Sequence, residues 1–370
     1  MKKTTLLGLW LTMTTIAASA QVSNSGDRKL FNHMDLGVTL GTTGIGAEIT
    51  MPAGDYVKLR TGFTYMPHFY KKMRFGALQV TENMSQSSFN RLSNMMKDFT
   101  GFEASSSIGM IGRPQMNNFK LLADIYPFKN NKHWHITAGF YAGRSNIAKA
   151  YNRQEETPSL MAVSMYNNIY WKMKYNQPLI KSDGNLGGLN PVDLPANIRN
   201  TILKHGTMGF RVGEFEKDFY ATQDIYYDHD VYDETQWEID DDGNIIGLKK
   251  IHNKGDIQYH KGELMYKAGD AYYMTPDQDL MVKAKAIVNA FRPYIGVGYN
   301  SVITKDKRTT LAVDCGIMMW GGAPKIVTHD GVDMMHDLTN VNGQVGDMLN
   351  LFRHFPIYPI LEIRIARKLF

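Results

Sequence analysis

The sequence has almost no cysteine. Among its 370 residues, Cys315 is the only one. A disulfide within the chain is therefore excluded. Cys315 falls on the apolar side of an alternating segment, where we expect a buried, unreactive thiol rather than a nucleophile.

Long hydrophobic runs are also missing. After residue 20, no stretch reaches the roughly 18 continuous apolar residues that a transmembrane helix needs. This excludes a helical membrane span in the remainder of the chain. Membrane-spanning β-strands are not excluded, because each is short and apolar on one side only.

Strong net charge and catalytic signatures are absent too. The formal net charge is +5, and it falls to +3 without Lys2 and Lys3. This is too mild to indicate a nucleic-acid partner. The sequence contains no HExxH motif, phosphate-binding loop or nucleophile motif.

The N-terminus has the features of a secretory signal peptide. Lys2 and Lys3 precede an apolar stretch, and Ala18-Ser19-Ala20 forms a small-residue cleavage site before Gln21. We expect residues 1–20 to be the signal peptide and residues 21–370 the mature protein. An N-terminal membrane anchor is the alternative, but the apolar stretch is too short to span.

Residues 119–142 contain two alternating runs joined by a polar turn at 128–132. Phe119, Leu121 and Ile125 point to one side of the first run, while Lys120 and Asp124 point to the other. The second run, 134–142, repeats the pattern. One apolar face and one charged face rich in small residues are typical of a membrane β-barrel wall.

Six further segments show the same alternation, which gives eight expected strands. Together with the two runs above, the eight expected strands cover residues 35–41, 44–51, 56–66, 119–126, 134–142, 284–299, 310–320 and 357–370. Short polar turns at 52–55, 128–132 and 304–308 alternate with long connections at 67–118, 144–283 and 321–356. Outer-membrane barrels sort their loops in this way, with short periplasmic turns and long extracellular loops.

The expected fold class is therefore all-β: a transmembrane antiparallel β-barrel of eight strands with long extracellular loops. We expect the loops to carry short helices near 88–99, 195–205 and 341–352. One alternative is a ten-strand barrel that adds a pair from 208–215 and 237–248. Another is a soluble periplasmic β-protein.

Four stretches, LLADIYPF…WHITAGFYAG, RPYIGVGYNS, LAVDCGIMMWGGAPKI and FPIYPILEIRIARKLF, resemble wall strands of small Gram-negative outer-membrane barrels. The likeness is greatest to the outer-membrane β-barrel proteins of Bacteroides-type bacteria. The resemblance implies location in the outer membrane among lipid and lipopolysaccharide, and insertion by the barrel-assembly machinery. It also implies that the terminal aromatic, Phe370, is part of the insertion signal. Phe370 is one residue out of phase with Leu369, which a bulge near 366–368 would correct.

Charged residues gather on the side of the strands that should face the barrel interior. An eight-stranded barrel is only wide enough for side chains to fill, so these charges must pair. We therefore predict a lumen filled by an ionic network and no general porin activity; the alternative is a proton or ion relay. The predicted network consists of Asp35, Glu48, Lys58, Arg60, Lys120, Asp124, Arg292, Asp314, Glu362 and Arg364.

An acidic segment lies in the longest connection. Residues 218–248 contain ten acids and no Lys or Arg, with tyrosines interleaved. Such oxygen ligands could hold Ca²⁺, although Lys249 stands where a calcium loop has a bidentate Glu. The alternatives are an Asp-Gly-Asn hairpin turn and a surface for carbohydrate or protein contact. The candidate metal ligands are Asp228, Asp230, Glu238, Asp240 and Asp242.

These features indicate a non-enzymatic outer-membrane barrel whose surface loops bind an extracellular ligand or support the envelope. A porin-like channel or uptake protein for small molecules is the alternative. A membrane-embedded hydrolase would need a serine such as Ser164, Ser182 or Ser301 beside a histidine, and no spacing supports one. We expect His133 and His135 to belong to a polar–aromatic girdle at the periplasmic rim.

Overall fold

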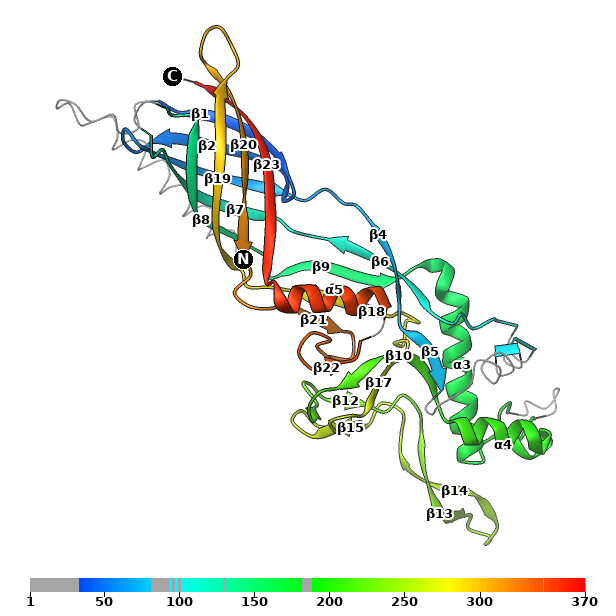
Figure 1. The fold of residues 1–370 in the computed structure, drawn as a ribbon. Helices are drawn as coiled ribbons and strands as arrows, with labels where there is room; N and C mark the ends of the chain where they lie inside the picture. The colour runs from blue at the N-terminus through cyan, green and yellow to red at the C-terminus, as the bar shows by residue number, and fades with distance from the viewer. Residues whose placement is uncertain are drawn as a thin grey trace.

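The computed structural model describes residues 33–80, 93–94, 97–98, 101–128, 131–181, 188–341 and 343–369. The predicted signal peptide, most of the helix expected at 88–99 and Phe370 lie outside these residues. A closed barrel forms one end of the molecule, and the long connections form a folded body at the other (Figure 1).

Eight antiparallel strands close the barrel, which confirms the predicted fold class and strand count. Each wall strand pairs with its neighbours along the chain order, and β1 pairs with β23 to complete the ring. The wall strands are β1 (Asp35–Gly41), β2 (Gly44–Pro52), β3 (Val57–Tyr65), β7 (Asn118–Ile125), β8 (Trp134–Gly143), β19 (Phe291–Val302), β20 (Thr309–Met319) and β23 (Ile357–Lys368).

Alternation along each strand sorts the side chains between the two sides of the wall. In β19, exposed and buried residues alternate from Phe291 to Tyr299. Apolar side chains point outward, and Val38, Phe63 and Phe291 are exposed over 60%, 63% and 55% of their surface. A continuous apolar exterior of this kind is unusual for a protein surrounded by water. Cys315 also lies on this exterior and is exposed, contrary to the expectation of a buried thiol.

Aromatic rings mark both ends of the wall. Next to the body, the rings of Phe140 and Phe291 lie 4.7 Å apart, and Phe119 contacts Phe140. At the other end, the rings of Trp134 and Tyr299 lie 5.1 Å apart. The eight residue steps from Phe291 to Tyr299 cover about 26 Å along β19, before any tilt of the strand. This is close to the height of the apolar band of outer-membrane barrels, roughly 25 Å.

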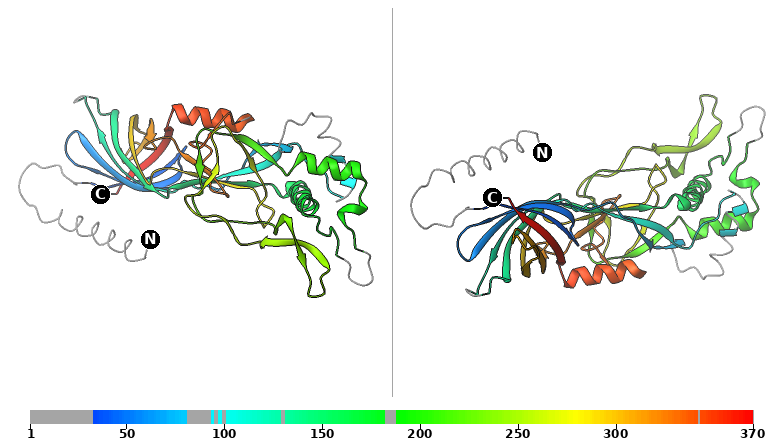
Figure 2. Two further views of the ribbon diagram at one scale, coloured as in Figure 1. Left: turned by 90° about the horizontal axis from the view of Figure 1, so that it is seen from below. Right: turned by 90° about the horizontal axis from the view of Figure 1, so that it is seen from above.

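The tight β1–β2 turn lies at the barrel end next to the body, whereas the other three short connections lie at the far end. The links between β2 and β3, β7 and β8, and β19 and β20 are found there, together with the ends of the described chain (Figure 2). The backbone N–H of Leu369 donates to the carbonyl oxygen of Met34 at 2.8 Å. The predicted alternation of short and long connections is therefore a division between two ends of the molecule.

Five wall strands continue beyond the barrel as an open sheet. Its strand order, β4-β6-β9-β18-β21, repeats the wall order β3-β7-β8-β19-β20. The strand expected at 284–299 is therefore two strands, because the chain leaves the extended pairing between Ile287 and Phe291. The extension strands are β4 (Lys71–Phe75), β6 (Ile108–Pro114), β9 (Asn146–Asn152), β18 (Lys283–Ile287) and β21 (Lys325–Thr328).

Smaller sheets and helices complete the body. They surround a hydrophobic core in which Ile108, Leu160, Phe210, Met274 and Leu338 are fully buried. The remaining strands are β5 (Ala77–Val80), β10 (Met208–Phe215), β11 (Phe219–Tyr220), β12 (Ile225–Tyr226), β13 (Val231–Ile239), β14 (Ile245–His252), β15 (Ile257–Tyr259), β16 (Leu264–Tyr266), β17 (Ala271–Met274) and β22 (Leu338–Thr339). The helices are η1 (Gln154–Glu156), α3 (Thr157–Lys174), η2 (Pro191–Asp193), α4 (Ala196–His205) and α5 (Gly343–His354).

The body differs from the predicted loops in two respects. Strands β10, β13 and β14 belong to body sheets, so the ten-strand alternative is wrong. The helices expected near 195–205 and 341–352 are present as α4 and α5, whereas α3 was not expected. Within the described residues, no helix has both the length and the hydropathy to cross a bilayer.

Candidate functional site

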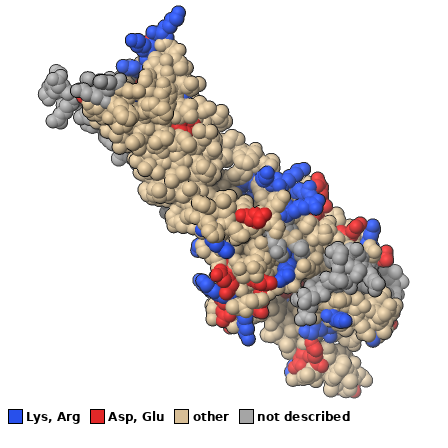
Figure 3. Space-filling model, in the orientation of Figure 1, with Lys and Arg blue, Asp and Glu red and all other residues tan. Residues whose placement is uncertain are grey.

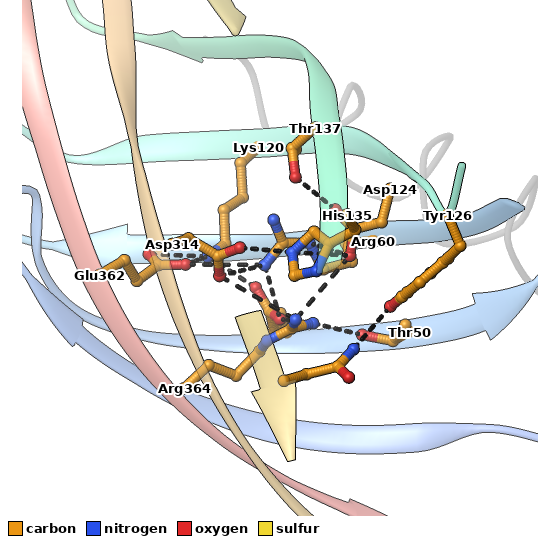
Figure 4. Close-up of polar contacts among 12 residues, drawn as sticks. Thr50, Arg60, Lys120, Asp124, Tyr126, His135, Thr137, Asp314, Glu362 and Arg364 are labelled. Atoms are coloured by element: carbon orange, nitrogen blue, oxygen red, sulfur yellow. Dashed lines mark hydrogen bonds and ion pairs between the residues drawn. The ribbon is translucent and has the colours of Figure 1, made fainter. Parts of the chain in front are cut away.

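Eight charged or titratable side chains meet inside the barrel and form what we call the charged layer (Figure 4). They come from six different wall strands, and each is almost fully buried. Seven of them belong to the predicted network, and His135 is the eighth. The charged layer consists of Glu48, Arg60, Lys120, Asp124, His135, Asp314, Glu362 and Arg364.

Two cations bridge carboxylates across the lumen. The Nζ atom of Lys120 lies 2.6 Å from Glu48 and 2.7 Å from Glu362. The guanidinium of Arg60 lies 3.1 Å from Asp124 and 3.0 Å from Asp314. Because these residues sit on β2, β3, β7, β20 and β23, the ion pairs connect strands on opposite sides of the barrel.

Arg364 and His135 complete the charged layer. Arg364 lies 3.1 Å from Glu48, and His135 Nε2 lies 2.7 Å from Asp314. The layer then holds four carboxylates against three fixed cations. Thr137 donates a hydrogen bond to Asp124 at 2.8 Å. His135 is 1% exposed, so it lies in the lumen rather than in the girdle where the sequence placed it.

Glycines on the inner side of the wall make room for these contacts. A Cβ atom at Gly298 would collide with both Asp314 and His135. A Cβ atom at Gly62 would collide with Glu48. The small residues on the polar face of the strands therefore determine how close the ion pairs can approach.

The other three predicted network residues lie apart from the charged layer. Arg292 is fully buried near the body, and its guanidinium donates to the side chain of Asn118 at 2.6 Å and to the carbonyl oxygen of Arg144 at 2.6 Å. Asp35 and Lys58 lie toward the short-turn end and are partly exposed. Lys58 lines a cavity of about 360 Å³ at that end.

A second layer fills the lumen between the charged layer and the body. We call it the apolar layer; it includes the inward side chains Leu122, Tyr141, Tyr294, Met318 and Ile360. The rings of Tyr141 and Tyr294 lie 5.5 Å apart, and each of the five side chains is at most 4% exposed. Side chains thus occupy the lumen at two successive levels.

The acidic segment contributes turns rather than a gathered ligand set. Asp240 accepts the backbone N–H of Asn244 at 2.7 Å and forms the tip of the β13–β14 hairpin. Asp228 lies 2.5 Å from His229, whose hydrogen bond lowers the pKa of that carboxyl. Asp230 pairs with Lys250 at 2.8 Å. The described part of the chain contains no group of three Asp, Glu, His or Cys side chains placed to hold a metal ion.

The serines considered for a hydrolase do not form a catalytic pair. Ser164 is exposed on α3 and Ser301 lies near the end of β19, and in the described residues neither hydrogen-bonds to a histidine. Ser182 lies outside the described residues.

Comparison with known proteins does not assign the chain to a family. No family model matches the chain, and no curated protein does. The solved structure of CarO2 from Acinetobacter baumannii is 12% identical, covers 92% of this chain and 99% of its own, and has a TM-score of 0.33. CarO of the same organism is 11% identical, covers 93% and 99%, and has a TM-score of 0.31. Overlays this poor carry no information about function.

Proposed function

We propose that this chain is a non-enzymatic outer-membrane barrel of a Gram-negative bacterium, resembling the small barrels of Bacteroides-type bacteria. The barrel acts as a closed membrane anchor, and the body is held outside the cell to bind a ligand or partner. The observation that carries this proposal is the filling of the lumen by the charged layer and the apolar layer.

A closed lumen follows from the energetics of the charged layer. Moving an ion through it would require separating buried pairs such as Lys120–Glu362 and Arg60–Asp314. Removing one partner from a buried pair costs about 3–5 kcal/mol. A permeating solute would also have to displace Tyr141 and Tyr294. The filled interior therefore favours an anchor over a porin-like channel.

The distal end of the body supports a role in binding. The β13–β14 hairpin exposes Trp237, Ile239, Ile245 and Ile246 over more than half of their surface. Exposed apolar groups gathered on one element are typical of interaction surfaces. The hairpin lies far from the barrel, where a cell-surface partner would reach it (Figure 1).

Bilayer conductance of the purified mature protein tests the closed lumen. We expect no stable conductance steps, with a general porin as the positive control. Heat-modifiable migration on gels should show in parallel that the barrel is folded. Steady open-channel currents from the folded barrel would contradict the anchor and favour the channel. Recovery of the protein in the soluble periplasmic fraction would contradict the membrane location itself.

A further inference from the structure

One face of the five-strand extension sheet carries a concentration of lysine and arginine, which we call the basic face. Lys and Arg side chains are visible where the body adjoins the barrel (Figure 3). The cross-strand register places eight of them on the same side of the sheet. The basic face consists of Lys72, Arg74, Arg113, Lys149, Arg153, Lys283, Lys285 and Lys325.

The basic face continues the outer surface of the barrel. On the opposite face of the sheet, Ala150 and Ile326 pack against the core of the body. Ala286, also on that face, packs against the apolar layer inside the lumen. Because the sheet repeats the order of the wall strands, the face with Ala286 continues the lumen side. The basic face therefore continues the apolar side that carries Phe140 and Phe291.

Three cations of the basic face lie directly opposite one another on adjacent strands. Arg113 pairs in register with Lys149, and Lys149 with Lys285. Neighbouring strands lie about 4.8 Å apart. Like charges directly opposite each other destabilise a sheet. A bound anion would offset this repulsion.

Most of the basic face has no acidic partner. Arg153 pairs with Glu156 at 2.7 Å, and Lys283 pairs with Asp277 at 2.6 Å. By contrast, the described residues provide no ion pair to Arg113, Lys149 or Lys285.

Lys72 and Arg74 likewise have no ion pair within the described residues. Together with Arg153 and Ser107, they line a cavity of about 640 Å³ at the β4 edge of the sheet. The unpaired cations of the basic face thus extend from the centre of the sheet into a recess large enough to admit a phosphate-bearing group.

The three opposed cations lie at one level above the aromatic rings of the wall. Arg113 precedes the start of β7 by five residues, Lys149 follows the end of β8 by six, and Lys285 precedes the start of β19 by six. An extended chain covers about 17–20 Å over these lengths. The outward side chains therefore change from aromatic at the end of the wall to cationic in the extension sheet, on the side of the apolar band where head groups would lie.

We infer that the basic face binds the phosphate-bearing head groups of an anionic glycolipid of the outer leaflet, of the lipopolysaccharide type. This inference rests on the proposed location in the outer membrane. Cations just beyond the apolar region of a membrane protein attract anionic lipid, and here they face the lipid side of the wall. Bound head groups would neutralise the cation row and hold the body against the membrane surface.

Native mass spectrometry of the mature protein in detergent tests this inference, with bis-phosphorylated lipid A as the probe. The triple variant Arg113→Gln/Lys149→Gln/Lys285→Gln should bind lipid A on the order of 100-fold more weakly than the parent. The matched control is Lys254→Gln/Lys261→Gln/Lys267→Gln, which removes the same charge from exposed positions of the distal body. The control should bind as the parent does, and dephosphorylated lipid A should bind weakly to all three proteins.

Several outcomes would overturn the inference. They are equal binding of lipid A by the triple variant and the parent, an equal loss in the control, and displacement of lipid A by millimolar inorganic phosphate. The double variant Lys149→Arg/Lys285→Arg keeps the charge and should retain binding even if the triple variant does not fold. Heat-modifiable migration distinguishes failure of this inference from failure of the proposed function. A folded membrane barrel that ignores lipid A overturns only this inference, whereas a soluble protein overturns the proposed function.

Discussion

Arg60 is the residue on which the charged layer depends most. Its guanidinium contacts Asp124 at 3.1 Å and Asp314 at 3.0 Å, and it lies 3.7 Å from Glu48. It is 1% exposed, so water cannot replace these contacts. An isolated buried charge costs several kcal/mol, and several carboxylates depend on this one cation.

We therefore expect Arg60→Met to destabilise the barrel by about 3–5 kcal/mol. Arg308→Met is the matched control, because Arg308 is exposed on the turn between β19 and β20 and should cost less than about 1 kcal/mol. Urea unfolding in vesicles, followed by heat-modifiable migration, measures both. Equal stability of the two variants would mean that the pairs in the lumen contribute little.

Ionisation of the buried Tyr266 should destabilise the body at alkaline pH. Burial raises the pKa of Tyr266 to about 12, and its ring stacks on Phe215 at 4.5 Å. An unfolded tyrosine titrates near pH 10. Because the folded pKa is the higher one, the stabilisation is complete below pH 10 and is lost as the pH rises from about 10 towards 12. The loss should reach about 2–3 kcal/mol.

Tyr266→Phe should remove that part of the alkaline loss, because phenylalanine keeps the ring but has no proton to lose. The measurement is the free energy of unfolding of the body between pH 9 and 12 (roughly the range that brackets both pKa values), followed by tryptophan fluorescence. Tyr226 is 55% exposed, so Tyr226→Phe should show the same pH dependence as the parent. A parallel decline in the parent and Tyr266→Phe would contradict the assignment.

At the scale of elements, the wall could be predicted from the sequence and the body could not. Each wall strand alternates because one side faces the lumen and the other faces outward, and β1 has the bounds expected from that pattern alone. In the extension sheet the alternation of apolar and polar residues is less regular. Along β18, small residues alternate with lysines, and the chain interrupts the pairing before Phe291.

The ionic network predicted from the sequence was only partly correct, for a similar reason. Alternation identifies which charges point inward, but not the level at which each lies. Arg292 and Lys58 therefore joined the predicted network although they lie toward opposite ends of the barrel, and His135 was assigned to the rim. Helix α3 has Pro158 at its start and Lys172 and Lys174 in its last turn, signals that could have identified it.

Helix α3 offers a test of how far the body folds separately from the barrel. Leu160 lies in the first half of α3 and is fully buried in the core of the body. Leu160→Ala should destabilise the body by about 2–5 kcal/mol through lost burial and the cavity left behind. Leu351→Ala on α5 is the matched control, because Leu351 is 56% exposed. Limited proteolysis should cut the body of Leu160→Ala faster, while the barrel keeps its heat-modifiable migration.

At the scale of the whole molecule, the two ends of the barrel differ in what they carry. Five wall strands continue into the body in the same order, so the two parts are joined along five strands rather than by one linker. The layers in the lumen, the aromatic rings and the basic face are therefore held in fixed succession along one axis. The proposed topology places the body outside the cell and the three turns at the far end of the barrel in the periplasm.

Cysteine labelling of intact cells tests this topology with a membrane-impermeant maleimide. Asp241→Cys lies at the tip of the β13–β14 hairpin, whereas Lys305→Cys lies on the turn between β19 and β20, and both positions are exposed. We expect Asp241→Cys to react in intact cells and Lys305→Cys to react only after the outer membrane is permeabilised. The native Cys315 is a built-in control, because it lies on the apolar exterior of the barrel. In the proposed membrane location lipid covers this exterior, so Cys315 should stay unlabelled until the barrel is unfolded. The reverse order of labelling would invert the topology, and the basic face would then meet the inner leaflet instead of the outer one.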